Sequence, residues 1–246
     1  MLEFNLFDEI EDSNVNEAVR FLNDNLEDDV TLNIDSIGGD VFAGLRLCQA
    51  IQNHKGKVTA KCGICVASIA SVIALTCDAV VLTKDTFFMV HQAWAVAQGT
   101  AEELMSTASL LEQASNRIQE IVAEKAKDVE AVAEWFKGDT WMGYQAVLDN
   151  FNDVSLVDEV KTLTAKAVAS ISKLSNKPEA LVELVAKAQA EAEEEEKKEE
   201  PPKDEEDEPQ EDEDKEKEDT EEEERKAQAK AYVESILAKA DTILNG

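Results

Sequence analysis

Three side chains that could together cleave an acyl bond lie far apart in the sequence: Ser68, His91 and Asp139. Ser68 opens an almost wholly apolar segment, residues 68–76, which we interpret as a buried helix whose N-terminus would stabilise developing negative charge. His91 closes a second apolar segment, residues 87–90, which is typical of a strand. From a strand end the imidazole could act as a general base towards a serine, and Asp139 could hold its tautomer.

Each of these residues also has a simpler interpretation. A serine in an apolar helix more often packs in the core or bonds to backbone, and we expect that role for Ser71. The second histidine, His54, lies in a charged stretch and is expected at the surface. Gly38 and Gly39 follow a β-branched segment, and they fit either an ordinary tight turn or a backbone that another chain approaches closely.

The elements that must position these residues predict an α/β fold with a largely parallel sheet. Apolar and β-branched segments predict strands at 2–7, 30–34, 57–60, 79–83, 87–90 and 156–160. Apolar residues at helical spacing predict helices at 14–26, 41–53, 68–76, 100–127, 129–136 and 143–149. Two helix starts carry the pattern of a capping box, Asn14 with Glu17 and Thr100 with Glu103.

The composition changes beyond residue 160, and it divides the chain into four parts. We expect a domain at 1–162, a helical extension at 163–196, an acidic low-complexity linker at 197–225 and an amphipathic helix at 226–246. The formal net charge is −30, and residues 191–225 alone hold 23 acidic against 6 basic side chains. Such a block should stay solvated. The apolar stripe of the last helix either docks a partner or folds back onto the body.

Several classes of function are disfavoured by the composition. No basic stripe is present for nucleic acid, and no apolar run is long enough to cross a membrane. The start of the chain does not look like a signal peptide. The cysteines fall in apolar segments and are expected to be reduced core thiols; Cys62 and Cys65 have the gap of a metal pair, but no second pair follows. We therefore expect no metal, no cofactor and, without a glycine-rich phosphate loop, no ATP hydrolysis.

In order along the chain, four segments resemble the proteolytic subunit of the Clp protease. The family's S-P-G-G turn, A-A-S-M nucleophile segment, M-I-H-Q strand and D-R-F-L aspartate segment have counterparts here. These read S-I-G-G at 36–39, V-A-S-I at 66–69, M-V-H-Q at 89–92 and D-T-W-M at 139–142. The sequence L-V-D-E-V at 156–160 also resembles the family's closing strand. The resemblance covers about residues 2–160.

The resemblance implies a Clp protease/crotonase-like fold of repeated β-β-α units with a long handle helix, and a serine endopeptidase working through an acyl-enzyme. Ser68 would be the nucleophile, His91 the general base and Asp139 its orienter. The N–H groups of Gly39 and Ile69 would form the oxyanion hole. An extended substrate would lie between the 38–41 segment and a strand beyond His91, in contact with Gly38, Asp40, Val41 and Ala93.

The resemblance also implies partners. Residues 100–127 match the handle helix that packs rings face to face, so a homo-oligomeric ring of six or seven subunits, possibly stacked, is implied. The chain begins almost directly at its first strand, without the family's axial-pore segment, which argues against an ATPase partner. That start and the acidic helical tail resemble the Clp-type head-maturation proteases of tailed phages. The expected substrates are then scaffold or capsid protein, and the expected location is the host cytoplasm or the inside of a procapsid.

Three other interpretations stay open. A crotonase-like acyl-CoA enzyme shares the fold and the paired N–H groups but does not require a serine and a histidine. A signal-peptide-peptidase-like enzyme would use a lysine base and a membrane anchor, and His91 argues against it. A non-enzymatic scaffold or assembly protein would be unaffected by loss of Ser68.

Overall fold

The computed structural model describes residues 2–158, 165–174 and 176–199. Strands alternate with helices along most of the chain, and the sheet is mostly parallel, so the predicted α/β class is confirmed. The strands are β1 (Leu2–Ile10), β2 (Val30–Gly39), β3 (Val58–Ala67), β4 (Ala79–Leu82), β5 (Phe87–Val90), β6 (Thr140–Gly143) and β7 (Val154–Leu156). The helices are α1 (Asp12–Asp24), α2 (Val41–Asn53), α3 (Ile69–Thr76), α4 (Ala101–Lys125), α5 (Val129–Trp135), α6 (Tyr144–Asn150), α7 (Ala165–Ser172) and α8 (Glu179–Glu199).

The sheet branches at its long third strand. Five parallel strands follow the order β1-β2-β3-β4-β7. The first half of β3, residues 59–61, pairs with β4, whereas its second half, residues 65–67, pairs with β5. Strand β6 then adds to β5 in the antiparallel direction. The carboxyl end of β3 therefore lies between β2 and β5, and this is where Ser68 follows.

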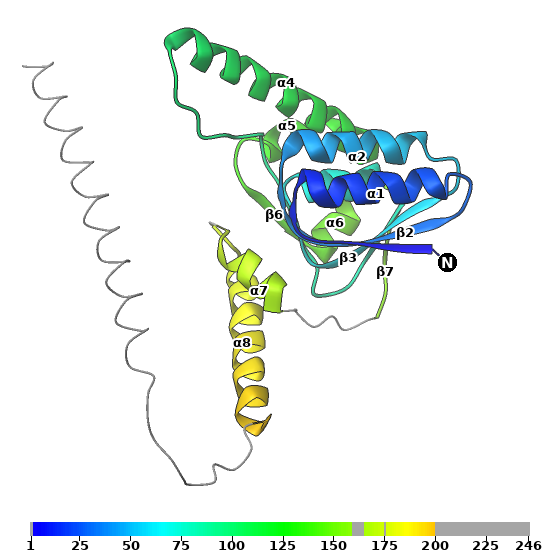
Figure 1. Cartoon of the computed structure of the whole chain (residues 1–246), viewed down its shortest axis with the longest axis vertical. Coiled ribbons are helices and arrows are strands. Elements are labelled where there is room, and N and C mark those ends of the chain that lie inside the picture. The colour runs from blue at the N-terminus through cyan, green and yellow to red at the C-terminus, as the bar shows by residue number, and fades with distance from the viewer. Residues whose placement is uncertain (1, 159–164, 175, 200–246) are drawn as a thin grey trace, which may run out of the picture. The chain divides into compact units, whose positions relative to one another are not determined.

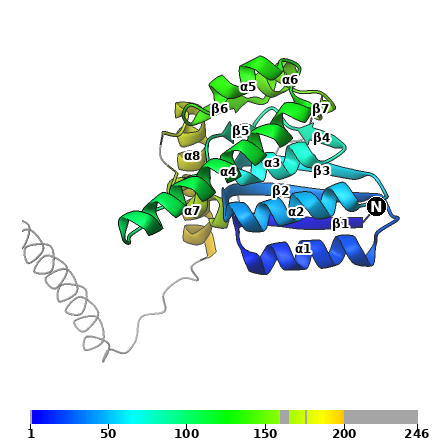
Figure 2. The same ribbon diagram turned by 90° about the horizontal axis from the view of Figure 1, so that it is seen from above.

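Helices α1 and α2 lie side by side against the sheet, and α4 extends beyond the body (Figures 1 and 2). Residues 101–113 of α4 are mostly exposed, and its buried residues begin at Ala114. A large apolar core joins α1, α2, α3 and the inner half of α4 to the sheet. Its most completely buried large side chains include Phe88, Phe136 and Phe151.

A second apolar core joins the hairpin formed by α7 and α8 to strands β3 and β5. Successive residues of a strand face opposite sides of its sheet. Val66 accordingly belongs to the large core, whereas its neighbours Cys65 and Ala67 belong to the second one. From the hairpin, Ile171 and Leu181 are buried in this second core. The hairpin thus shares a buried core with Ala67, the residue that precedes Ser68.

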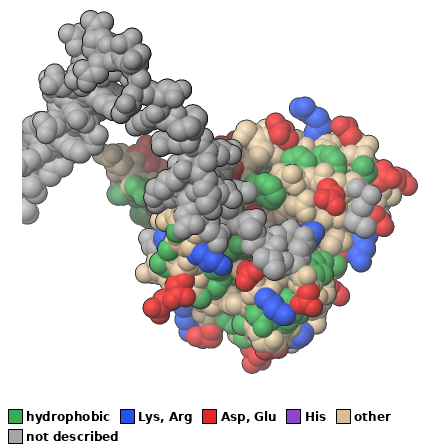
Figure 3. Space-filling view, turned by 90° about the horizontal axis from the view of Figure 1, so that it is seen from below, with side chains coloured by type: hydrophobic (Ala, Val, Ile, Leu, Met, Phe, Trp, Pro, Cys, Tyr) green, Lys and Arg blue, Asp and Glu red, His purple; other side chains and the backbone are tan. Residues whose placement is uncertain are grey.

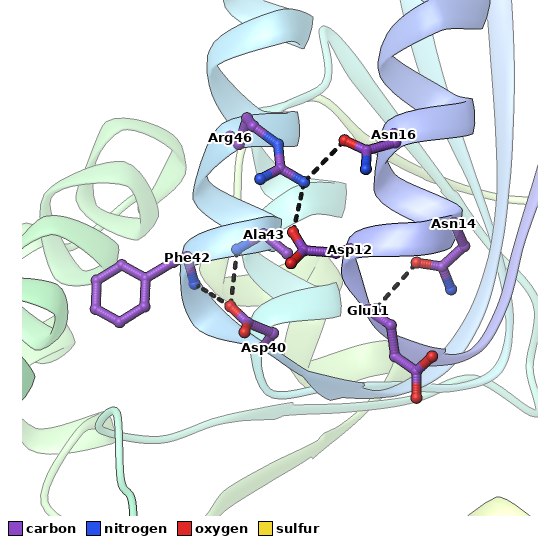
Figure 4. Close-up of polar contacts among 8 residues, drawn as sticks. All are labelled: Glu11, Asp12, Asn14, Asn16, Asp40, Phe42, Ala43 and Arg46. Atoms are coloured by element: carbon purple, nitrogen blue, oxygen red, sulfur yellow. Dashed lines mark hydrogen bonds and ion pairs between the residues drawn. The ribbon is translucent and has the colours of Figure 1, made fainter.

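The start of α1 differs from the expectation. The capping box is formed by Glu11 and Asn14, so Asn14 is the third helical residue instead of the cap. Figure 4 shows this contact beside the start of α2, where the Asp40 carboxylate accepts hydrogen bonds from two backbone N–H groups at 2.8 Å each. Arg46 of α2 donates to Asp12 at 2.8 Å and to Asn16, which ties the first turns of the helices together.

Several strands also differ from the expectation. Strand β2 does not end before the glycines, because β1 pairs with it as far as Gly39. Strand β3 runs to Ala67, beyond the expected end at 60. Strand β7 ends at Leu156, where the prediction began, and β6 was not predicted at all. The capping box of Thr100 with Glu103 is confirmed, and it starts α4.

Of the parts predicted beyond residue 162, the structure describes the helical extension but little of the acidic linker and none of the last helix. The helical extension contains α7 and α8, whereas the acidic linker beyond residue 199 and the amphipathic helix at 226–246 lie outside the described residues. Within the described ranges, no helix combines the length and the apolar character needed to cross a membrane. On the face drawn in Figure 3, basic side chains are interspersed with acidic ones and do not gather into one surface.

Candidate functional site

Ser68 occupies the junction between β3 and α3. Its backbone N–H donates to the carbonyl oxygen of Met89 at 2.9 Å, and this bond fixes the junction against β5. The backbone has φ 57° and ψ −132°, a combination that is unusual for a residue with a side chain. Such a conformation costs roughly 1–3 kcal/mol and recurs at functional sites. Ser71, by contrast, donates its hydroxyl hydrogen bond to the Ser68 carbonyl at 2.6 Å, as expected of a structural serine.

His91 follows the strand that pairs with the end of β3. Because Ala67 of β3 lies opposite Met89 of β5, Ser68 and His91, which follow these two strands, are neighbours. The His91 Nε2 atom is 2.8 Å from the Ser68 Oγ atom. The imidazole side chain is only 16% exposed. It lies within the distance that proton transfer to or from the serine requires.

Asp139 reaches the imidazole from its other side. The antiparallel partner of Val90 is Thr140, so the residue before Thr140 lies opposite the residue after Val90. Asp139 Oδ1 is 3.0 Å from His91 Nδ1. Its second oxygen, Oδ2, is 3.4 Å from the Asn176 amide nitrogen, at the turn between α7 and α8. Thus the structure brings Ser68, His91 and Asp139 into one continuous set of contacts.

The paired glycines lie against Ser68. A Cβ atom added at Gly38 would be 2.5 Å from the Ser68 Cβ atom, and its φ is 92°. A Cβ atom added at Gly39, whose φ is 150°, would be 2.3 Å from the Ile10 carbonyl oxygen. These distances are too short for a side chain, so close approach of backbone explains the glycines better than the ordinary turn does. Ser36 holds the segment by accepting the Gly38 N–H at 3.1 Å.

Two neighbouring cavities open on either side of His91. The first, of about 460 Å³, is lined by every predicted site residue except Asp139. These are Gly38, Gly39, Asp40, Val41, Ser68, Ile69, His91 and Ala93. The second cavity, also of about 460 Å³, contains Asp139 together with His91. The predicted residues therefore gather along one open groove.

The segment beyond His91 is not the strand that was expected. Residues 91–98 have no regular secondary structure, and the Ala93 N–H donates to the Ser115 hydroxyl of α4 at 3.1 Å. Sequence reasoning also missed several residues that line the groove, among them Trp94, Lys173 and Leu174. The two from the hairpin lie in a region that the motif pattern does not cover, so no local signal pointed to them.

The cysteines are buried and free of disulfides, as predicted. Burial raises the pKa of Cys48 to about 11. Burial also raises the pKa of the Cys62 and Cys65 thiols, and the nearby Asp35 carboxylate raises them further. Across the described ranges 2–158, 165–174 and 176–199, no group of three or more His, Cys, Asp or Glu side chains is arranged to hold a metal ion.

Comparison with known proteins finds a matching family model and curated relatives. The family model described as Clp protease matches residues 3–164, which include all the motif residues discussed above. The ATP-dependent Clp protease proteolytic subunit 3 of Rhodococcus jostii (strain RHA1) is 31% identical over 137 residues. That alignment covers 54% of this chain and 65% of the relative, so the chain spans less than two thirds of the relative's length.

Proposed function

The chain belongs to the Clp protease family, and from that premise we propose that it is a serine endopeptidase in which Ser68, His91 and Asp139 are the catalytic residues. The observation that carries the proposal is the pair of contacts made by the imidazole, 2.8 Å to Ser68 Oγ and 3.0 Å to Asp139 Oδ1. A hydroxyl, an imidazole and a carboxylate in this order form a catalytic triad: the hydroxyl is the nucleophile, the imidazole is the general base, and the carboxylate orients the imidazole.

In the proposed mechanism His91 Nε2 takes the Ser68 proton while Oγ attacks the carbonyl carbon of the scissile peptide bond. The tetrahedral intermediate then collapses, and the imidazolium gives the proton to the leaving amine. In the second half of the reaction, water takes the place of the amine. His91 Nε2 takes a proton from the water as it attacks the acyl carbon, and the proton returns to Ser68 Oγ when the acyl bond breaks. Asp139 stays ionised throughout and keeps Nδ1 protonated, which leaves Nε2 free to accept.

The backbone N–H groups of Gly39 and Ile69 are the proposed oxyanion donors. Both residues line the cavity that contains Ser68, and Ile69 is the first residue of α3. N–H groups in the first turn of a helix have no partner within the helix, and the helix dipole favours negative charge there. Each such donor contributes roughly 3–4 kcal/mol to stabilisation of the transition state in comparable enzymes.

The proposed substrate is an extended peptide. Residues 38–42 and residues 91–95 both line the cavity. Since residues 91–98 form no ladder with the rest of the sheet, their backbone has room to pair with a bound peptide at positions other than Ala93. We expect the groove to bind a peptide through its main chain, with Gly38, Asp40 and Val41 opposite.

Labelling with a fluorophosphonate tests the nucleophile directly. We expect the wild-type protein and Ser71→Ala to be labelled, and Ser68→Ala not to be. His91→Ala should be labelled several orders of magnitude more slowly. Ser71 is the matched control because it is a second serine only three residues away, inside α3, and its hydroxyl donates to the Ser68 carbonyl oxygen. A folded wild-type protein that takes no label would contradict the proposal and favour the acyl-CoA or scaffold alternatives.

A homo-oligomeric ring of six or seven subunits is the proposed assembly. Its support is the exposed half of α4, where Leu104, Met105 and Leu110 are 41%, 71% and 48% exposed. An isolated chain rarely leaves such a row of apolar side chains in water. Light scattering of the purified protein should give a mass of several chains, and Met105→Asp together with Leu110→Asp should lower it. A monomeric wild-type protein would contradict this assembly.

We further propose an ATP-independent head-maturation role in a phage, with scaffold or capsid protein as substrate, in the host cytoplasm or inside the procapsid. The support is the acidic composition of residues 191–225 joined to a peptidase-like domain. Co-expression with the capsid protein tests it. Deletion of residues 226–246 should reduce packaging of the protease, and unchanged packaging would exclude docking through that segment. Cleavage that requires added ATP and an ATPase would exclude independence.

A further inference from the structure

The α7–α8 hairpin lies beyond residue 164, where the match to the family ends, yet it is built into the groove. Its buried residues Ile171, Leu181 and Val185 belong to the same buried apolar cluster as Ala67 and Met89. Ala67 precedes Ser68, and Met89 bonds to the Ser68 N–H. This cluster therefore links the hairpin to the strands that position the triad.

The turn between the two helices reaches the groove itself. Lys173 and Leu174 line both of the cavities that flank His91. The Lys177 ammonium fixes the turn, because it donates to the carbonyl oxygens of Ser172 at 2.9 Å and Leu174 at 2.7 Å. Asn176, in the same turn, is the residue whose amide lies 3.4 Å from the Asp139 carboxylate.

Most charged side chains around the turn already have a partner, whereas Lys173 does not pair with any residue that the structure describes. Asp139 is occupied by His91, and the Lys137 ammonium is paired with Glu134 at 2.5 Å. Two carboxylates line the first cavity: Asp40 is occupied as the cap of α2, and the exposed Glu9 side chain lies beside Gly39. No residue that the structure describes forms an ion pair with the Lys173 ammonium. A cation is thus available beside the half-buried apolar side chain of Leu174.

We propose that the hairpin turn forms one wall of the substrate groove and that Lys173 selects peptides with an acidic side chain close to the cleaved bond. Leu174 supplies the adjoining apolar contact. The inference rests on the proposed peptidase activity and adds to it the class of substrate. An acidic side chain bound there would pair with Lys173 near solvent, where an ion pair changes affinity only modestly and is weakened by salt.

The test is cleavage of a peptide library prepared from a bacterial proteome, with the cleaved bonds identified by mass spectrometry. For the wild-type protein we expect Asp and Glu to be enriched within about three residues of the cleaved bond, the reach of a side chain in an extended peptide. In Lys173→Glu the ratio of acidic to basic residues there should fall by about three- to tenfold. At an ionic strength of about 0.5 M the wild-type preference should shrink.

Lys57→Glu is the matched control, because it makes the same charge change beside the first residue of β3, at the opposite end of the strand from Ser68. It should keep the wild-type preference. Separate samples of all three proteins are labelled with a fluorophosphonate, and unlabelled protein is used for the cleavage. Equal labelling with an unchanged cleavage pattern in Lys173→Glu would overturn this inference alone. A wild-type protein that neither takes the label nor cleaves would overturn the peptidase proposal and the inference with it.

Discussion

Replacement of Gly38 by alanine should damage both the fold and the candidate site. The φ of Gly38 is 92°, which a residue with a Cβ atom adopts at a cost of roughly 1–3 kcal/mol. The new Cβ atom would also be 2.5 Å from the Ser68 Cβ atom and 2.8 Å from the Ala67 carbonyl oxygen. Carbon atoms in contact are about 3.5–4.0 Å apart, so the two segments must separate by about 1 Å.

That displacement gives two magnitudes. Conformational strain and overpacking together should lower the free energy of unfolding by about 2–5 kcal/mol. The Ser68 hydroxyl is 2.8 Å from the imidazole, and a shift of about 1 Å at a reacting group costs about 100-fold in rate. Urea denaturation measures the first effect, and the rate of fluorophosphonate labelling in native buffer measures the second.

Gly143→Ala is the matched control. Gly143 has φ −72°, and an added Cβ atom would meet nothing within 4 Å. Its free energy of unfolding should change by less than about 1 kcal/mol, with labelling close to wild type. The reasoning is refuted if Gly38→Ala keeps the wild-type urea midpoint and labelling rate, or if the two alanine variants lose stability equally.

Two further predictions concern helix capping and alkaline pH. Asp40→Ala should lose about 1–2 kcal/mol of stability and Asp40→Asn much less, because the side-chain oxygen caps α2; equal losses in urea melts would show that the charge matters and not the cap. The pKa of Cys48 is raised from 9.0 to about 11 by burial, so the unfolded thiol ionises first and stability should fall as the pH rises from 9 to 11. For each such thiol the free energy of unfolding should fall by up to about 1.4 kcal/mol per pH unit. This dependence should be weaker in Cys48→Ala, and an equal dependence in that variant would contradict the prediction.

The parts of the fold that could be predicted are those whose signals are local. Helix α2 was predicted at its observed residues, because helical apolar spacing extends over its whole length. The start of α4 was found from the Thr100–Glu103 capping box. At α1 the same reasoning chose the wrong pair, since Glu11 and Asn14 can each serve as cap or as third residue. The residue types alone do not decide between the two.

Strand β6 could not be predicted because its stability is not local. Its four residues carry no alternating pattern, and they become a strand by pairing with β5. Asp139 owes its position to that pairing, so only the family resemblance pointed to it among the many aspartates. The continuation of β2 through Gly38 and Gly39 has the same origin, because β1 pairs with both residues after a register shift.

The helical extension shows a different limit. Composition predicted a helical extension at 163–196, which contains most of α8, but helical spacing does not tell which surface a helix will cover. The second core is completed by Ile64, Cys65 and Ala67, which lie beyond the end of the strand predicted at 57–60. The contact of the hairpin turn with the groove is therefore a tertiary fact that no motif records.

The direction of the strands explains why these remote residues meet. Ser68, His91 and Gly39 each stand at the carboxyl end of a parallel strand, and in such a sheet these ends lie at the same edge. Asp139 reaches that edge from the opposite direction, because it precedes a strand that is antiparallel to β5. A slip of one residue in the β5–β6 register would turn each side chain of β6 to the other face, and Asp139 would no longer follow the Val90–Thr140 pair towards the imidazole. The antiparallel register of β6 is thus as necessary to the candidate triad as the three side chains themselves.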